Sequence, residues 1–147
     1  MSNRIAIVGA KGGVGKTTVA LNISCLLAQA GRQVTLVDGD LHTPHVAINL
    51  GYMHPPVSLH DVLASKASLK QSLYVHGSGL RILPGSMAYD AISSVSYAQF
   101  THLCDELKDL GELVIIDAPS GFGHQLDAIL KGVDGVIIVT APDLASQ

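Results

Sequence analysis

The stretch Ala10-Lys-Gly-Gly-Val-Gly-Lys-Thr-Thr18 decides the fold, because it joins a short apolar run to a segment with helical periodicity. The preceding residues, Arg4–Gly9, are β-branched and apolar, which is typical of a strand buried on both faces. After the loop, apolar residues recur at helical spacing from Lys16 to Ala30, and Gly31 is a stop signal. A glycine-rich loop between a buried strand and a helix is where phosphate sites form.

The loop residues fit a phosphate cradle, or P-loop, in type and spacing. Its glycines allow successive backbone N–H groups to approach phosphate oxygens. We expect Lys16 to reach the β- and γ-phosphates, the Thr17 hydroxyl to bind Mg²⁺, and Thr18 to donate to the α-phosphate. One position departs from the strict pattern, which begins with Gly where this chain has Ala10. The predicted nucleotide ligands are Gly12, Gly13, Val14, Gly15, Lys16, Thr17 and Thr18.

A second carboxylate is needed to hold the metal from the side opposite the threonine hydroxyl. Leu113-Val-Ile-Ile-Asp117 supplies one, because Asp117 follows four apolar residues in the Walker B form. The alternative is an aspartate that merely caps the turn after a strand. Pro119 and Gly121 stiffen that turn, and the Gly121 N–H is a candidate sensor of the γ-phosphate.

The rest of the chain alternates between strand and helix patterns. Further strands are expected at Gln33–Val37, Leu80–Leu83, Leu113–Ile116 and Gly135–Thr140, and further helices at Tyr97–Leu110, Gln125–Lys131 and briefly after the N-cap Ser58. The segment Leu41–Val57, rich in Pro, is expected to be an irregular, mobile loop. This order predicts an α/β fold, a doubly wound and mostly parallel sheet with helices on both faces.

Composition narrows the class of protein further. The length of 147 residues suits one domain, and a formal charge of −3 with nine Lys and Arg argues against a large nucleic-acid footprint. Cys25 and Cys104 show no CxxC spacing and are interpreted as reduced thiols of a cytosolic protein. The apolar runs are far shorter than the roughly 20 residues that span a bilayer.

The extra lysine of the loop, Lys11, gives the sequence a family resemblance. With this loop the chain resembles the deviant Walker A ATPases of the MinD/ParA family, a type of P-loop NTPase, over nearly its whole length. The resemblance also rests on Val37-Asp-Gly-Asp40, Ile116–Gly121 and Val139–Asp143. It implies that Lys11 reaches the partner's nucleotide in an ATP-dependent homodimer. The alternative is a solvated loop lysine.

The resemblance also assigns two acids after the second strand. It implies that Asp40 orients the attacking water and that Asp38 supports the Mg²⁺ site together with Thr17 and Asp117. Both acids could instead form the turn around Gly39. The irregular spacing of His42, His45 and His54 favours a polar switch or partner surface over a metal site.

The function implied by the family is a Mg²⁺-dependent ATP hydrolase that works as a dimerisation-coupled switch in prokaryotic cell division or spatial positioning. A protein activator or cargo is the expected partner. The alternatives are a metallocluster-assembly or metal-insertion ATPase and a nucleotide-dependent binding module that does not hydrolyse ATP. The expected location is cytoplasmic, and peripheral membrane attachment stays open, although no amphipathic anchor is recognised before Gln147.

The family alignment also predicts the sheet and its limits. The strands should lie in the order Leu80, Gln33, Leu113, Arg4, Gly135, each named by its first residue, which puts the last at an edge. Yet Val136–Val139 has no polar alternation, as in a strand that is covered on both faces. Relatives begin another helix after Thr140. We therefore expect residues 1–147 to be a single ATPase domain that lacks the C-terminal part of the family fold, including its nucleobase contacts.

Overall fold

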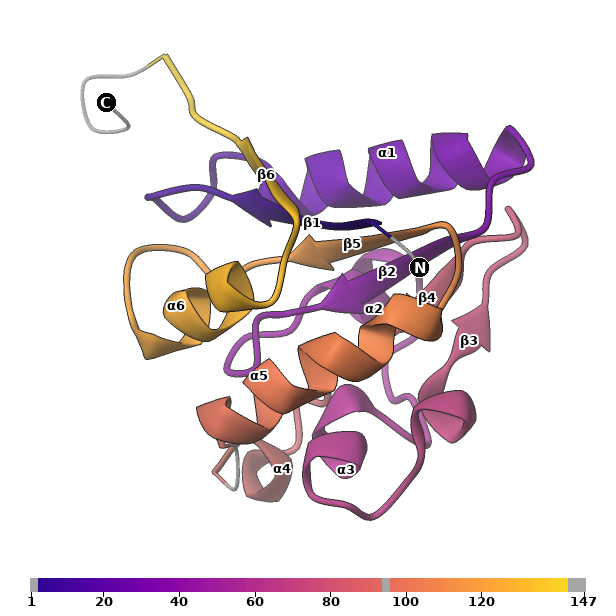
Figure 1. Ribbon diagram of the computed structural model, residues 1–147, viewed down its shortest axis with the longest axis vertical. Helices are drawn as coiled ribbons and strands as arrows, with labels where there is room; N and C mark the ends of the chain where they lie inside the picture. Colours follow the sequence, from indigo (N-terminus) through magenta and orange to yellow (C-terminus); the bar gives the residue numbers. More distant parts are fainter. Residues whose placement is uncertain (1–2, 94–95, 143–147) are drawn as a thin grey trace.

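The chain folds as a sheet between two layers of helices, described here from a computed structural model for residues 3–93 and 96–142 (Figure 1). The strands are β1 (Asn3–Val8), β2 (Val34–Asp38), β3 (Tyr74–Val75), β4 (Arg81–Leu83), β5 (Leu113–Asp117) and β6 (Gly135–Ile138). The α-helices are α1 (Lys16–Gln29), α2 (Val46–Asn49), α3 (Leu59–Leu63), α4 (Tyr89–Ser93), α5 (Tyr97–Glu106) and α6 (His124–Lys131), and the 3-10 turns are η1 (Leu69–Ser72) and η2 (Leu107–Asp109).

The sheet has the predicted strand order. Its six described strands lie in the order β3-β4-β2-β5-β1-β6, and all pairs are parallel except β3 with β4. Right-handed crossovers through helices place parallel strands in this way. The carboxyl ends of β1, β2 and β5 therefore meet at one edge, where Asp38 and Asp117 are register partners. Ligands of open α/β sheets bind at this edge.

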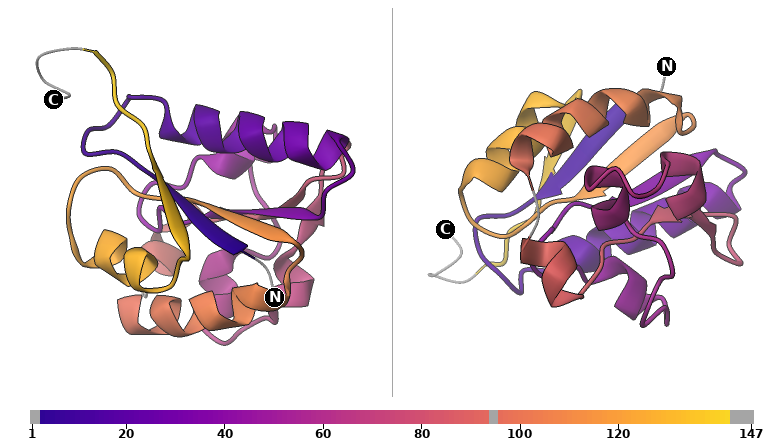
Figure 2. Two further views of the ribbon diagram at one scale, coloured as in Figure 1. Left: turned by 45° about the horizontal axis from the view of Figure 1, so that its top comes forward. Right: turned by 90° about the horizontal axis from the view of Figure 1, so that it is seen from below.

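Helices cover both faces of the sheet. In Figures 1 and 2, α1 lies on one face, whereas α5 and α6 lie on the other. Strand β5 shows why both faces are filled: Ile115 packs in the cluster with α1, and Val114 and Ile116 pack in the cluster with α5 and α6. Phe100 of α5 is fully buried in the second cluster, and its truncation to Ala should cost about 3–5 kcal/mol.

Local structure departs from the sequence expectations in a few places. The segment Leu41–Val57, expected to be irregular, contains the short helix α2. Strand β3 was not predicted, and the helix expected to run to Leu110 ends as an α-helix at Glu106 and continues as the 3-10 turn η2. The N-cap at Ser58 is confirmed, because Ser58 and Asp61 form a reciprocal capping box.

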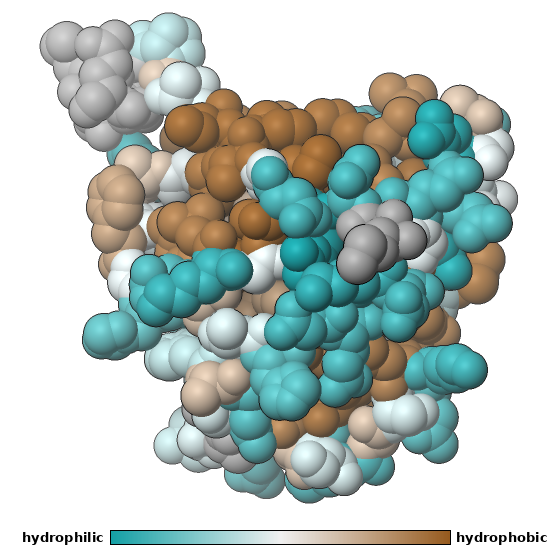
Figure 3. Space-filling view, viewed as in Figure 1, coloured by the Kyte–Doolittle hydropathy of each residue, from teal (hydrophilic) through white to brown (hydrophobic). Residues whose placement is uncertain are grey.

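Strand β6 is an edge strand with an exposed apolar surface. Val136, Ile137 and Ile138 are 44%, 38% and 75% exposed, so the covering on both faces that the pattern suggested is not seen in the described residues. Apolar side chains gather on this part of the molecule, which Figure 3 shows. The further helix expected after Thr140 concerns residues 143–147, which lie outside the described part. Within the described ranges, no helix is long and apolar enough to span a membrane.

Candidate nucleotide-binding site

The glycine-rich loop leaves β1 and enters α1 at the sheet edge where the two acids meet. Gly13 and Gly15 take φ values of 78° and 102°, a left-handed conformation that strongly favours glycine. Gly15 is the N-cap of α1, and no side chain described here caps the helix, so its first-turn N–H groups remain available to an anion. The Val14 side chain lies against Gly9, since a Cβ on Gly9 would come within 3.1 Å of the Val14 Cγ2.

A polar cavity of about 380 Å³ opens over this loop. It is lined by three groups of residues: the loop and first turn (Gly12, Gly13, Gly15, Lys16, Thr17, Thr18), the segment after β2 (Asp40, Thr43, His45) and the segment after β5 (Asp117, Ala118, Ser120). Three stretches far apart in sequence thus meet at one cavity. Its lining combines backbone donors, a lysine, hydroxyls and carboxylates, which suits a phosphate with a hard cation.

Lys16 is buried and directed along the loop. Its Nζ donates a hydrogen bond of 2.6 Å to the Ser120 Oγ and lies 3.5 Å from the Lys11 carbonyl oxygen. A lysine held in this way by a hydroxyl and a carbonyl presents its charge to the cavity. It is therefore placed to neutralise phosphate oxygens.

Thr17 and Asp117 form the other half of the site. The Thr17 Oγ1 donates to the Asp117 Oδ2 over 2.6 Å, while the Asp117 Oδ1 is buried and lacks a hydrogen-bond partner in the described structure. Burial raises the pKa of Asp117 to about 6, against the opposing effects of the Thr17 hydrogen bond and the Lys16 charge. A buried carboxylate with an unused oxygen beside a hydroxyl fits the oxygen donors that Mg²⁺ prefers.

Asp38 lies behind Asp117 and not in the lining of the cavity. It is fully buried, its Oδ2 accepts the Val46 N–H at 2.9 Å, and its Oδ1 has no partner among the described residues. Burial raises the pKa of Asp38 well above the usual range, and the charges of Asp117 and Asp40 add to this effect. The support of a Mg²⁺ site by Asp38, which the family resemblance implied, stays a prediction.

Asp40 lines the cavity and also shapes its own loop. Its Oδ1 accepts the N–H groups of His42 and Thr43 at 3.2 and 2.9 Å, and its Oδ2 accepts the Thr43 hydroxyl at 2.8 Å. The turn-forming role left open by the sequence is therefore present in the structure. It coexists with a position at the cavity.

Four predicted site residues lie outside the cavity lining: Lys11, Val14, Asp38 and Gly121. Lys11 is exposed at the start of the loop, and the Gly121 N–H donates to the Gly9 carbonyl at 3.3 Å, so in this structure that N–H is engaged inside the protein. The sequence interpretation missed Ser120, Thr43 and the cavity position of His45. Of these three, Ser120 was the easiest to predict from the sequence, because its hydroxyl lies in the turn after the Walker B strand, where it can meet Lys16.

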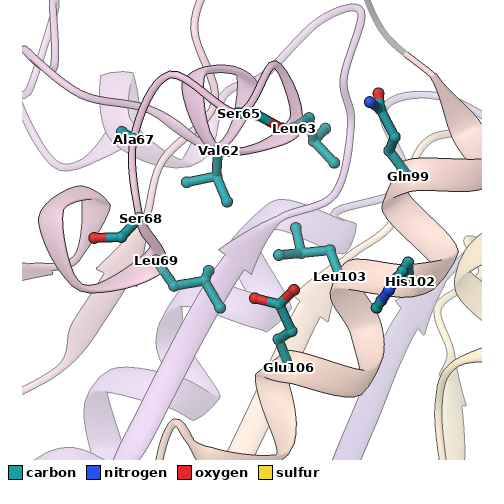
Figure 4. A pocket seen from close by; sticks show the side chains of 10 residues that line it. All are labelled: Val62, Leu63, Ser65, Ala67, Ser68, Leu69, Gln99, His102, Leu103 and Glu106. Atoms are coloured by element: carbon teal, nitrogen blue, oxygen red, sulfur yellow. The ribbon is translucent and has the colours of Figure 1, made fainter.

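The larger hollow of the molecule, about 490 Å³, lies elsewhere, between the α3–η1 segment and α5. Figure 4 shows Val62, Leu69 and Leu103 directed toward it. Its ionisable lining residues are His102 and Glu106. Neither lysine nor glycine occurs among its lining residues. No group of His, Cys, Asp and Glu suited to a metal cluster occurs in residues 3–93 and 96–142.

Fold and site together define a P-loop nucleotide-binding protein. A family model described as an AAA domain matches residues 2–147. The sequence is 32% identical to an uncharacterised ATP-binding protein of Methanocaldococcus jannaschii, 32% to the septum site-determining protein MinD of Thermotoga maritima and 30% to the antiactivator FleN of Pseudomonas aeruginosa, covering 97–99% of this chain. The chain belongs to this family of MinD/ParA-type P-loop ATPases.

Solved structures agree with that assignment. The cell division ATPase MinD of Pyrococcus furiosus and MinD of Pyrococcus horikoshii, the latter complexed with Mg-ADP, each superpose with a TM-score of 0.93 at 33% identity. They cover 99% of this chain, which in turn covers 62% and 60% of them. This chain spans about half the length of the curated relatives it matches.

Proposed function

We propose that this chain is a Mg²⁺-dependent ATP hydrolase that acts as a dimerisation-coupled switch in prokaryotic cell division or spatial positioning. The observation that carries the proposal is the cavity in which the Lys16 ammonium and the Thr17–Asp117 pair face one space. The names of relatives, septum site-determining MinD and the antiactivator FleN, support the positioning role. A protein activator or cargo and a cytoplasmic or peripheral membrane location belong to the same proposal.

The residues divide the work of phosphoryl transfer. The loop N–H groups and Lys16 would hold the β- and γ-phosphates, and Thr17 with Asp117 would hold Mg²⁺. Bound there, Mg²⁺ supplies charge neutralisation for the phosphate oxygens. Asp40 would orient a water for in-line attack on the γ-phosphorus, which forms one P–O bond and breaks the bond to ADP.

Lys11 is the residue that would make hydrolysis depend on a dimer. In the described chain Lys11 is exposed and absent from the cavity lining, which supports a role toward another subunit's nucleotide. A charge supplied in trans stabilises the transition state as an arginine finger does. Hydrolysis should then require two chains.

Phosphate release measured with Mg²⁺ and ATP across protein concentrations tests the proposal. We expect turnover per chain to rise with concentration, because each site would need Lys11 of the partner. Lys16→Ala is the control for contaminating ATPases. Absence of turnover above that control, with ATP still bound, would instead identify a binding module that does not hydrolyse.

A further inference from the structure

A chain of side-chain hydrogen bonds connects α5 to the backbone beside Asp40. The Tyr97 hydroxyl lies 3.4 Å from the His42 Nε2, and the His42 Nδ1 lies 3.1 Å from the Gln125 Oε1. The Gln125 Nε2 then donates to the Gly39 carbonyl at 2.7 Å. The residues come from α5, the loop after β2 and α6, so the network spans three separate elements.

The donor and the acceptor of each hydrogen bond in this network can be assigned by starting from the Gly39 carbonyl. The Gly39 carbonyl can only accept, which fixes the Gln125 amide with its NH₂ group inward and its oxygen toward His42. That oxygen requires a donor, so His42 carries its proton on Nδ1. The Nε2 atom of His42 is then an acceptor for the Tyr97 hydroxyl.

Gly39 is held from both sides by residues of the Walker B segment and the helix after it. Its N–H donates to the Asp117 carbonyl at 2.9 Å, and its carbonyl accepts from Gln125. Space is equally restricted, because a Cβ on Gly39 would lie 2.7 Å from the Ile116 Cγ2 and 2.8 Å from the Asp117 carbonyl oxygen. The residue next to Asp40 is therefore hydrogen-bonded on both sides and tightly packed on its Cα face, and Gln125, itself 8% exposed, supplies one of the two hydrogen bonds.

We propose that Gln125 is a positioning residue for hydrolysis, which holds the Asp40 loop (Gly39–Thr43) in register with the P-loop, with His42 as its link to α5. This inference rests on the proposed ATP hydrolysis. Gln125 is absent from the cavity lining, so it acts on Asp40 through Gly39 and His42. Its loss should lower kcat and leave KM for ATP unchanged, because the phosphate cradle is built by other residues.

The experiment compares Gln125→Leu with Gln99→Leu, a matched change at an exposed position of α5. We expect Gln125→Leu to lower kcat about tenfold at constant KM, and Gln99→Leu to leave both unchanged. His42→Ala and His42→Asn serve as variants at an exposed position that should not disturb folding. Asn keeps a donor where the Nδ1 atom lies, so His42→Asn should retain more of kcat than His42→Ala.

Two readouts do not depend on turnover. Nitrogen-15 NMR of the histidines should show the Nδ1–H form for His42 in the parent and its loss in Gln125→Leu. The His42 and Thr43 amides, which are bonded to the Asp40 carboxylate, should exchange faster with solvent in that variant. If the parent shows no ATPase activity, the proposed function fails while these readouts still test the loop. Unchanged exchange and tautomer in Gln125→Leu, or equal kcat in all variants of an active parent, would overturn the inference.

Discussion

The Thr17 hydroxyl donates to the Asp117 carboxylate over 2.6 Å, although the two residues are 100 positions apart in the sequence. The contact joins the first turn of α1 to the end of β5 across β1. Asp117 is almost fully buried and one of its oxygens lacks a hydrogen-bond partner in the described structure, so the ionised carboxylate costs free energy that a bound cation would offset.

Asp117→Asn should therefore stabilise the nucleotide-free protein and weaken its Mg²⁺ response. The folded pKa of about 6 lies above the ordinary 3.8, so the stabilising effect of the protonated form is complete below 3.8 and is lost as pH rises through 6. At pH 7.5 the variant should gain up to about 3 kcal/mol, and near pH 4 the gain should vanish. Thermal unfolding at both pH values measures it, with Asp127→Asn, an exposed ion-pair residue, as control. A parent that is more stable than the variant at pH 7.5 would contradict the prediction.

Lys16→Ala should remove ATP binding. The variant loses the ammonium that is buried along the loop, and the phosphates lose their direct counter-charge in a partly dehydrated site. We expect an affinity loss of about 100-fold or more in calorimetry, whereas Lys131→Ala, on the exposed face of α6, should bind as the parent does. Undiminished affinity would remove Lys16 from the nucleotide site.

Lys11→Ala should have the opposite profile, with ATP binding retained and turnover suppressed. The side chain lies outside the cavity lining of its own chain, and its proposed target is the partner's nucleotide. Calorimetry and phosphate release on the same sample measure the two properties. Turnover at the parent rate would show that Lys11 is a solvated loop residue.

Asp40→Asn separates the two roles of this side chain. An amide oxygen can still accept the His42 and Thr43 N–H groups, so the loop should persist while the charge that orients water is lost. The variant should bind Mg·ATP and accumulate as the ATP-bound dimer in gel filtration, as should Asp40→Ala with a less ordered loop. The exposed change Asp90→Asn is the control. A variant that stays monomeric at saturating ATP would count against the assignment.

His60 should make stability fall at acid pH. Its Nε2 lies 2.8 Å from the Leu41 carbonyl and its Nδ1 accepts the Ser86 N–H at 3.0 Å, an arrangement of neutral imidazole. Burial lowers the pKa of His60 below 6.5, so its contribution is present above 6.5 and is lost as pH falls through the lowered value. Relative to His60→Gln, the parent should lose stability between pH 7 and 5 in denaturant titrations. His54→Gln, at an exposed site, should not alter that slope.

The strands were predictable where apolar residues fill both sides of the sheet. The runs ending at Asp38 and Asp117 gave β2 and β5 within a residue, and the strand order is confirmed. Tyr74–Val75 was missed because two residues carry no periodicity, and their pairing depends on the turn before β4. Helix α2 was missed because the N–H of its first residue, Val46, donates to the Asp38 carboxylate, a contact that no local sequence pattern indicates.

In the site, too, residues within local motifs were predictable and contacts between distant segments were not. Lys16, Thr17 and Asp117 belong to motifs whose spacing is local, and the structure places all three at one cavity, although their roles stay predictions. The bonds of Ser120 to Lys16 and of Gln125 to Gly39 join residues 104 and 86 positions apart. No local pattern encodes such pairs, since they arise only when the sheet brings β1, β2 and β5 together.

The two buried carboxyl groups at the ends of β2 and β5 also bear on the lifetime of the protein. Under the proposed function, Mg²⁺ bound at Asp117 would add a counter-ion for these groups, and its binding would then shift the folding equilibrium by mass action. A chain without that ion would then open more often and be cut faster by proteases, so Mg·ATP should slow its proteolysis.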